Sequence, residues 1–536
     1  MKKSSDLGYH ATLQYNFSKY THSFFVNTFS IQLQQNLTNC KRRMPSEDIL
    51  TYLFQTADGV NCAIIYADGI VNKQLLGDLI ARPLSRLSLS DTSQKDIGRY
   101  ETNKKNTKEQ QQDTLFERIE KTVLFPEQKR IQNWMDGEKE VLDGNCLLLV
   151  DGVTEGLMLG AKLLPARAVI EPPTDVAVKG PREGFVEDVK TNMALLRKRI
   201  KTPDLRFETL RVGKQSDTAV SICWLEGTSN AVIKKELKDK IKNMQIDCVP
   251  DSSYIAAMLA PRKHSLFRSI GTTEKPDIFA AKISEGRVGV LVDGSPIALT
   301  VPYILSEDIQ SSEDYFISPF MATIFRFLRT ISLFVAILLP AFYVSAQLFK
   351  LQLLPLSLTL TIASSVRELP LSPSLEMFVV LLLLEILKEA SIRMPKYVGM
   401  SLSVVGALVL GETAVSAGFL STPAIIVVAF SGICLYTVPN FVETGSILRW
   451  LFLLVSGSLG PFGIVLFSAF LLYYLISADS FQTPPLAPFS PFEQHDFKDA
   501  IFKYDMRSLA KRPRLFQSPN KTRFRTQPNP NAQNIH

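Results

Sequence analysis

An apolar block in the second half of the chain constrains the fold more than any other feature. The first three hundred residues have a mixed composition, whereas residues 331–477 form long apolar runs that only a few charged side chains interrupt. A helix needs about 20 apolar residues to cross the hydrocarbon core of a bilayer, and several of these runs approach that length. The sequence therefore predicts a large soluble part followed by an integral membrane part.

Five segments are expected to span the membrane. They lie near residues 331–349, 376–392, 400–420, 423–439 and 450–476, and the shorter segment 353–364 is either a sixth span or a re-entrant piece. The full division that we expect is a polar N-terminal extension (1–44), a first soluble subdomain (45–165), a hinge with a helix (166–200), a second soluble subdomain (201–320), a transmembrane bundle of about five or six segments (321–480) and a basic C-terminal tail (481–536). The length of 536 residues accommodates such a bundle and two or three soluble modules.

Four strand-like runs in the soluble part end in an acidic residue and a glycine, namely Asp68-Gly69, Asp151-Gly152, Glu226-Gly227 and Asp293-Gly294. Such a pair is typical of a tight turn. The first and third pairs precede helix-like stretches (71–80 and 231–241), and the other two precede another apolar strand. Because this order occurs twice, we expect an α+β soluble half of two related α/β subdomains, followed by a polytopic α-helical transmembrane bundle. The polar run 90–113 indicates an insertion into the first subdomain.

A connector rich in proline and glycine joins the two subdomains. It runs through Glu171-Pro-Pro-Thr-Asp175 and Lys179-Gly-Pro-Arg-Glu-Gly-Phe185 into a helix over residues 186–200. Prolines fix an extended backbone and glycines permit sharp bends. Charged side chains in such a frame favour contacts with specific backbone groups, so we expect a structured hinge rather than a flexible linker.

Motifs for common catalytic chemistry are missing. The chain has no phosphate-binding loop, no dinucleotide-binding glycine motif and no nucleophile elbow. Its five histidines are far apart without neighbouring ligands, so no metal site is expected. Its six cysteines have no framework spacing and are expected to be reduced and mostly buried. We therefore expect no enzyme and no cofactor, and the polar N-terminal stretch does not indicate a signal peptide.

Three charged residues of the apolar block have a helical spacing that makes them candidates for a gate. Glu385, Glu389 and Arg393 follow one another at intervals of one helical turn, so they share a face of a helix over residues 374–392. Charges in a span usually face the bundle interior or water. The pattern fits a pore lining and an interhelical ion-pair lock equally well.

Two further features of the block concern polar function. Glu412 stands between small residues in the middle of a predicted span, which favours a functional polar site over a buried packing role. The last span is interrupted by Ser456-Gly-Ser-Leu-Gly-Pro-Phe-Gly463. Because proline frees a backbone carbonyl, a kinked or broken helix is expected there.

The C-terminal tail is basic and contributes to the net charge of +7. A basic segment after a span usually stays on the cytoplasmic side and contacts anionic lipid. Arg326 and Arg329, just before the first span, favour the same side for the soluble half, and both ends on one side require an even number of spans. Nucleic-acid binding is the weaker interpretation, because no aromatic-interleaved basic fold accompanies the tail.

The hinge residues also carry a family resemblance. They are Glu171, Pro172, Gly180, Pro181, Arg182, Gly184, Phe185, Glu187, Asn192, Arg197 and Arg199. Matching segments follow at residues 273–277, 285–296, 313–316, 405–411 and 486–489. Together they resemble the A-subunit family of spore germinant receptors from endospore-forming bacteria, over about residues 143–492. The chain departs from the family at Arg367-Glu-Leu-Pro370, which lacks a glycine, and at Glu412, where glutamine is common.

The resemblance implies a receptor subunit in the inner spore membrane, with its soluble half on the side of the spore core. It implies a permease-like B subunit and a lipoprotein C subunit as partners, together with further copies of the chain. It also implies that the subunit passes ions when a nutrient is sensed. Two alternatives stay open: a scaffold or relay subunit that conducts nothing, and a subunit that itself binds the nutrient between its two lobes.

Overall fold

The computed structural model describes residues 27–87, 116–163, 179–262, 265–350, 352, 355–366, 369–393 and 412–524. They belong to two compact units. The first contains the chain up to Ala260, Ile270–Pro302 and Lys511–Phe524, and the second contains Pro261–Ser269 and Tyr303–Ala510. The predicted insertion at 90–113 lies outside the described residues.

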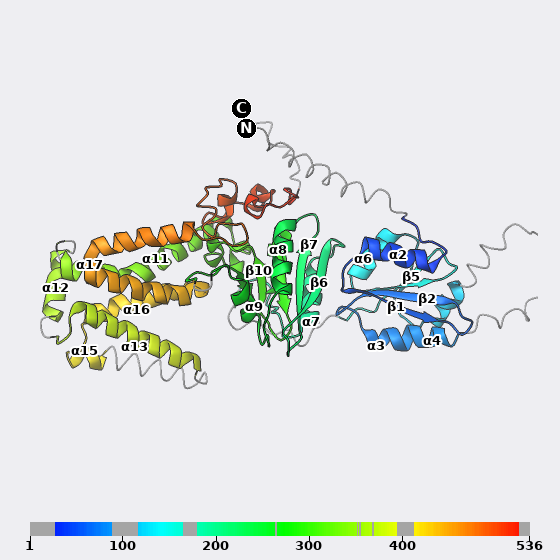
Figure 1. Cartoon of the computed structure of the whole chain (residues 1–536), viewed down its shortest axis with the longest axis horizontal. Coiled ribbons are helices and arrows are strands. Elements are labelled where there is room, and N and C mark those ends of the chain that lie inside the picture. Colours follow the sequence, from blue (N-terminus) through cyan, green and yellow to red (C-terminus); the bar gives the residue numbers. More distant parts are fainter. Residues whose placement is uncertain are drawn as a thin grey trace, which may run out of the picture. The chain divides into compact units, whose positions relative to one another are not determined.

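The first unit begins with a five-stranded sheet covered by helices on both faces (Figure 1). Its elements are α2 (Leu33–Arg43), β1 (Ile49–Gln55), β2 (Asn61–Ala67), α3 (Lys73–Leu75), the π-helical turn η1 (Leu76–Ala81), α4 (Arg82–Ser85), β3 (Gln128–Ile131), α6 (Trp134–Leu142), β4 (Cys146–Val150) and β5 (Gly156–Leu159). The strand order is β1-β2-β4-β5-β3, and every neighbouring pair is antiparallel.

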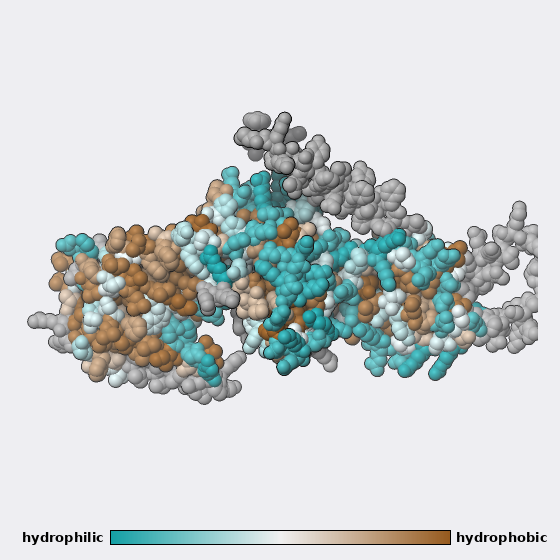
Figure 2. Space-filling model, in the orientation of Figure 1, coloured by the Kyte–Doolittle hydropathy of each residue, from teal (hydrophilic) through white to brown (hydrophobic). Residues whose placement is uncertain are grey.

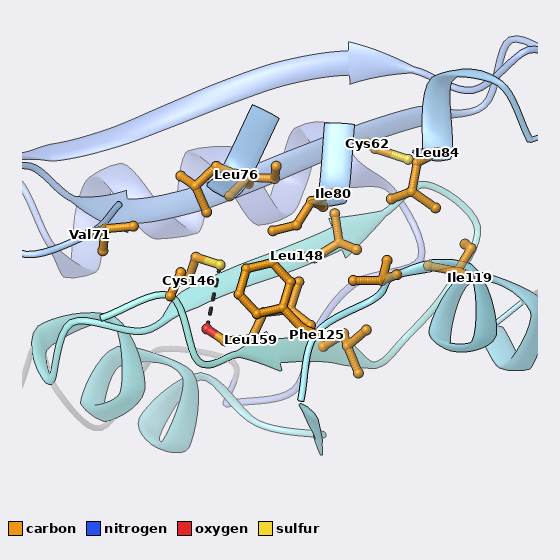
Figure 3. Close-up of a cluster of buried hydrophobic side chains, with 14 of the residues drawn as sticks. Cys62, Val71, Leu76, Ile80, Leu84, Ile119, Phe125, Cys146, Leu148 and Leu159 are labelled. Carbon is orange, nitrogen blue, oxygen red and sulfur yellow. Dashed lines mark hydrogen bonds between the residues drawn. The ribbon is translucent and has the colours of Figure 1, made fainter. Parts of the chain in front are cut away.

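Alternate residues of the central strands serve opposite faces of this sheet. Ala63 and Ile65 pack under α2 and α6, whereas Cys62 and Ile64 pack on the other face. Figure 3 shows the second cluster, in which Ile80 and Leu84 meet the sheet. The central strands β2 and β4 are apolar along nearly their whole length because both of their faces are buried.

The second sheet repeats the first. Its elements are α7 (Val189–Arg199), β6 (Leu205–Val212), β7 (Thr218–Leu225), α8 (Ala231–Lys242), α9 (Ser252–Leu259), β8 (Gly271–Thr273), α10 (Pro276–Ser284), β9 (Val288–Val292) and β10 (Ala298–Val301). The strand order is β6-β7-β9-β10-β8, which is the order of the first sheet with each strand replaced by its counterpart. The predicted internal repeat of two α/β subdomains is therefore confirmed at the level of topology.

The repeats also correspond in hydrogen bonding. The leading helices start at Leu33 and Val189, and the first strands start at Ile49 and Leu205. In both cases the two repeats are 156 residues apart. Asn36 accepts from the backbone N–H of Ser30 at 2.8 Å and donates to its carbonyl at 2.7 Å. Asn192 makes the same two bonds with Val186, at 2.9 and 2.5 Å. An asparagine thus holds the chain entering each leading helix.

These leading helices shift two of the predicted boundaries. Residues 27–44 were expected to form a polar extension, but Leu33 and Cys40 are buried under the first sheet. The predicted hinge helix likewise belongs to the second repeat, because Leu195 and Leu196 lie in its core. The polar composition of this segment did not indicate α2, because a helix needs only a few apolar positions on one face to cover a sheet.

The second unit is built mainly from helices. They are the short helices η3 (Leu305–Asp308) and η4 (Ser312–Tyr315), α11 (Pro319–Phe349), α12 (Leu356–Val366), α13 (Pro373–Arg393), α15 (Ala414–Ser416), α16 (Thr422–Tyr436), η7 (Pro439–Phe441), α17 (Val442–Ile476), η8 (Asp496–Asp499) and η9 (Met506–Leu509). The turn η10 (Arg514–Phe516) lies in the segment that returns to the first unit. Figure 2 shows hydrophobic residues over much of the visible face of the long helices.

Two of the described helical segments are long and apolar enough to cross a membrane by length and composition, Pro319–Phe349 and Pro439–Ile476. They contain the predicted first and last spans. The predicted spans at 376–392 and 423–439 correspond to α13, which carries five charged residues, and to α16, which has only 15 residues. Most of the span predicted at 400–420 lies outside the described residues, and its described end contains a turn at Gly418 rather than a continuous helix.

Candidate functional site

A chain of polar contacts joins four helices of the second unit. Arg449 on α17 donates to Glu385 on α13 at 2.8 Å and to Ser431 on α16 at 3.2 Å. Ser431 in turn donates to the carbonyl of Ala336 on α11 at 2.7 Å. That carbonyl is free because Pro340, four residues later, has no N–H to donate to it. The Arg449 side chain is only 1% exposed.

A second cation shares the Glu385 carboxylate. Lys388 pairs with its other oxygen and also donates to Ser446 on α17 at 3.2 Å. Two cations and one carboxylate in an apolar bundle are costly to desolvate, and removing one partner of a buried pair typically costs about 3–5 kcal/mol. The arrangement therefore fixes α13 to α17 as long as all partners are present.

The structure separates the three residues that were expected to share one face. Glu385 reaches α17. Among the described residues, Glu389 and Arg393 form an ion pair only with each other, at 2.6 Å, and their side chains are 57% and 78% exposed. An exposed pair of this kind contributes at most about 1 kcal/mol. Of the three, only Glu385 is built into the bundle.

Glu412 is exposed, and it is the first described residue after residue 393. The described chain beyond it forms only the three-residue helix α15 and then turns at Gly418, whose φ of 67° ends the helix. The expected setting of Glu412 in the middle of a span stays a prediction, because residues 394–411 lie outside the described part of the chain. Its role in a gate remains a prediction.

The expected break in the last long helix is confirmed. Within α17, Gly460 has φ 63° and ψ −146°, and Pro461 follows it. A side chain at Gly460 would lie 2.8 Å from Phe349 at the end of α11. Glycine is thus required both for the backbone conformation and for the close approach of α11.

A second buried ion cluster lies at the start of α11. Arg326, whose side chain is 0% exposed, donates to Asp314 at 2.9 Å and to Asp499 at 3.0 Å. Arg329 binds Asp314 as well, at 2.9 Å. Lys503 is also buried and pairs with Asp499 at 3.2 Å. The basic residues that flank the first long helix are therefore held in ion pairs with the segment that follows the last one.

In the first unit, an ion pair joins the two repeats. Arg197 on α7 donates two hydrogen bonds of 2.9 Å to the carboxylate of Asp48, and both side chains are almost fully buried. The guanidinium also donates to the carbonyls of Thr202 and Leu205. Because every nitrogen of Arg197 has a partner, the pair is satisfied despite its burial.

The remaining hinge residues have structural contacts. Phe185 packs edge-on against Phe279 in the second core, and the carbonyl of Glu187 accepts from the N–H of Gly294. Arg199 pairs with Glu183 at 2.7 Å. Gly180, Pro181 and Arg182 lie in the loop before α7, where Gly184 is buried, and Glu171 and Pro172 lie outside the described residues. A functional role for these residues remains a prediction.

Residues 511–524 of the predicted basic tail pack against the second repeat. In the segment 511–524, Arg512 donates to the carbonyl of Ser284 at 2.8 Å, and Arg523 pairs with Glu285 at 2.7 Å. Phe516 is 1% exposed and lies under the guanidinium of Arg287 at 4.2 Å. These cations are used within the protein, which reduces the charge that the tail could offer to lipid.

Reactive and metal-binding groups are scarce in the described residues. No group of three or more His, Cys, Asp or Glu side chains in that part of the chain could hold a metal ion. The cysteines are free, and all except Cys248 are buried. Burial raises the pKa of Cys40, Cys62 and Cys146 to about 12, so these thiols stay protonated.

Sequence reasoning missed the partners that define these sites. Arg449, Glu376 and Asp314 were not singled out, although Arg449 and Glu376 are isolated charges in apolar runs and therefore candidates on that ground alone. Nothing in the local sequence indicates that Arg449 meets Glu385, because the two are brought together only by helix packing.

Comparison with known proteins places the chain in a family. The profile described as "Bacillus/Clostridium GerA spore germination protein" matches residues 33–515. The chain is 30% identical to spore germination protein KA of Bacillus subtilis, over 92% of this chain and 88% of that protein. It is 32% identical to spore germination protein GerQA of Bacillus cereus, over 75% and 82% of the two chains.

Two further similarities were found. The uncharacterized membrane protein YfkQ of Bacillus subtilis is 32% identical over 92% of each chain. The crystal structure of the N-terminal domain of the A subunit of the Bacillus megaterium spore germinant receptor GerK3 matches with a TM-score of 0.37 and 27% identity, over 52% of this chain and 96% of that one. The match of the family profile to most of the chain shows that this protein belongs to the GerA family of spore germination proteins.

Proposed function

We propose that this chain is the A subunit of a nutrient receptor of bacterial spores. It spans the inner spore membrane several times, with the two repeats on the side of the spore core, and acts with a permease-like B subunit, a lipoprotein C subunit and further copies of itself. Family membership supports the receptor role. The two long apolar helices support a membrane location, and the names of the relatives describe germination proteins rather than a reaction.

The receptor subunit passes ions once a nutrient is sensed, and the polar chain through Arg449 holds it closed. The observation that carries this proposal is the contact of Arg449 with both Glu385 and Ser431, which links α13, α17, α16 and α11. Pairs of this kind stabilise one helix arrangement and not another, so they can separate two states. Nutrient binding to the permease-like partner shifts the equilibrium towards an arrangement in which the pair is broken.

The test is potassium efflux from vesicles that contain this chain and its permease-like partner. Wild-type vesicles should release potassium only on addition of a nutrient. Glu385→Gln leaves Arg449 buried without its carboxylate, so the closed state is destabilised and efflux without nutrient should rise. The double variant Glu385→Gln with Arg449→Met removes both charges and should restore part of the closed behaviour.

Glu389→Gln is the matched control, because Glu389 lies one turn from Glu385 but makes only an exposed pair. Its efflux should equal that of the wild type. If an assembled, nutrient-binding complex releases no potassium, this subunit is instead a scaffold or relay. The fixed links between helices also suit that second function.

The remaining alternative makes this chain the nutrient binder. Exchanging the A and B subunits between two receptors of different nutrient specificity separates the two cases. Specificity should follow the permease-like subunit, and specificity that follows this chain would place the nutrient site here.

A further inference from the structure

A fully buried carboxylate lies apart from the Arg449 contacts. Glu376, in the first turn of α13, is 0% exposed. One of its oxygens accepts from the backbone N–H of Ser421 at 2.5 Å. Ser421 is the N-cap of α16, and the N-terminus of a helix favours a negative charge. The carboxylate of Glu376 therefore lies at the N-terminal end of α16.

Within the described part of the chain, several other polar atoms near this carboxylate have no hydrogen-bond partner. They are the second oxygen of Glu376, the hydroxyl of Tyr343 and both polar atoms of the Gln347 side chain, all of them buried. The Tyr343 hydroxyl lies against Ser421, Gln347 and Glu376. Buried polar atoms are nearly always satisfied in native proteins, so a group of them at one place indicates a bound species.

The described protein supplies no positive charge to balance Glu376. None of the ion pairs among the described residues includes it, and the cations Lys388 and Arg449, further along α13 and on α17, are bound to Glu385. A bound species that suits this group of described residues therefore carries a positive charge and accepts oxygen ligands. The available oxygens are one carboxylate oxygen, one amide oxygen and the hydroxyls of Tyr343 and Ser421.

We infer that α11, α13 and the N-terminus of α16 form a binding site for a monovalent alkali cation, with Glu376 as its only charged ligand. Magnesium and calcium sites usually use more carboxylates or several waters, and transition metals favour His or Cys, which this group lacks. A role for the site on an ion path rests on the proposed function, but cation binding itself does not.

Equilibrium binding of radioactive rubidium to the full chain, purified in detergent, tests the inference. Wild-type protein should show one saturable class of sites from which potassium displaces rubidium and choline does not. Glu376→Gln should abolish this binding. Glu389→Gln, which removes an exposed carboxylate from the same helix, should leave it unchanged.

Gln347→Leu keeps the carboxylate and removes one neutral ligand, so it remains informative if Glu376→Gln fails to fold. It should weaken rubidium binding roughly tenfold, which is the scale of supporting groups at metal sites. Absence of saturable binding by folded wild-type protein, or equal binding by Glu376→Gln, would overturn the inference. Since the assay needs neither partner, nutrient nor flux, a negative result here is distinct from a failure of the efflux experiment.

Discussion

The two repeats of the first unit have the same topology but are completed by different parts of the chain. In the first repeat, the turn at Gly144, between α6 and β4, is covered by the residues directly after β5. The N–H of Leu163 in that segment donates to the carbonyl of Ile70. In the second repeat, the corresponding turn at Gly286, between α10 and β9, is covered by Ser518 from the C-terminal segment. The hydroxyl of Ser518 donates to the carbonyl of Thr228. The first turn is covered by residues close in sequence, whereas the second is covered by residues far along the chain.

The first strands of the repeats differ in the same way. The edge of β6 is covered by the first repeat, since Ser46 accepts from the N–H of Phe207 and Glu47 accepts from that of Thr209. The corresponding strand β1 exposes Tyr52 and Leu53 by 51% and 59%. The second repeat is thus stabilised by two distant segments, so its stability should respond to changes outside it more strongly than that of the first.

The largest effect is expected from Arg197→Ala. It leaves the carboxylate of Asp48 buried without its cation, which should cost about 3–5 kcal/mol. Amide hydrogen exchange in the full chain should show faster opening of both β6 and the loop before β1. Lys41 is the counterpart of Arg197 in α2 and is exposed, so Lys41→Ala should change the opening free energy by less than about 0.5 kcal/mol. Equal effects of the two changes would contradict the asymmetry.

Phe516→Ala should release the C-terminal segment from the second repeat. Phe516 is buried, and removing a buried phenylalanine side chain costs about 3 kcal/mol or more. Limited proteolysis should then cut within residues 511–524 while both sheets stay protected. The control is Phe502→Ala, because Phe502 is 47% exposed. A second repeat that opens no faster after this change would mean that the segment contributes nothing to its stability.

Asn36→Ala and Asn192→Ala compare the one feature that the repeats share in detail. Each change removes two hydrogen bonds to partly buried backbone groups and should cost about 2 kcal/mol, within the range for polar groups that lose their partners. Because the two geometries agree, the losses measured by hydrogen exchange in α2 and α7 should be similar. A large difference would show that the surroundings of the two helices, rather than the asparagine bonds, determine their stability.

The smallest effect is expected for the stability of the first repeat in acid, through Asp143 in the turn between α6 and β4. A hydrogen bond from Lys201 holds the pKa of Asp143 below its ordinary value of 3.8, although burial opposes the shift. A lowered folded pKa means that the contribution is present above pH 3.8 and is lost as the pH falls through the lower folded value. Asp143→Asn should remove it, at less than about 1 kcal/mol because the side chain is one-third exposed.

Lys201→Met provides the matched change on the other partner. It should remove the same contribution, and the double variant should add little to either single change. Acid unfolding of the three variants followed by fluorescence would check this. Independent, additive losses would show that Asp143 and Lys201 do not act as a pair.

Much of the first unit could be predicted from residues close together in the sequence. The Asp-Gly and Glu-Gly pairs fix turns because glycine accepts a positive φ, and Gly152 and Gly294 have φ values of 88° and 83°. Repetition of these turns was enough to predict the repeat. The leading helix α2 was missed because its buried face consists of few residues among many polar ones, and only the sheet reveals which face is covered.

The candidate sites of the second unit were less accessible to sequence reasoning. The sequence identified Glu385 as a charge in an apolar run and predicted the break at Gly460, since both depend on local composition and backbone chemistry. It grouped Glu385 with Glu389 and Arg393 by helical spacing, but the structure pairs Glu385 with Arg449, which is 64 residues away. Spacing along one helix specifies a face and not what packs against it.

By itself the sequence determined the two-part character of the chain, the repeated turns, the kink in α17 and the resemblance to spore germination proteins, because each is carried by contiguous residues. Only the tertiary structure decided that Arg197 holds the two repeats together, that the C-terminal segment completes the second one, and that Glu376 is buried with one oxygen that has no partner among the described residues. The physical reason is that the energy of a buried charge depends on the groups that replace its water, and those groups are supplied by distant segments when the chain packs.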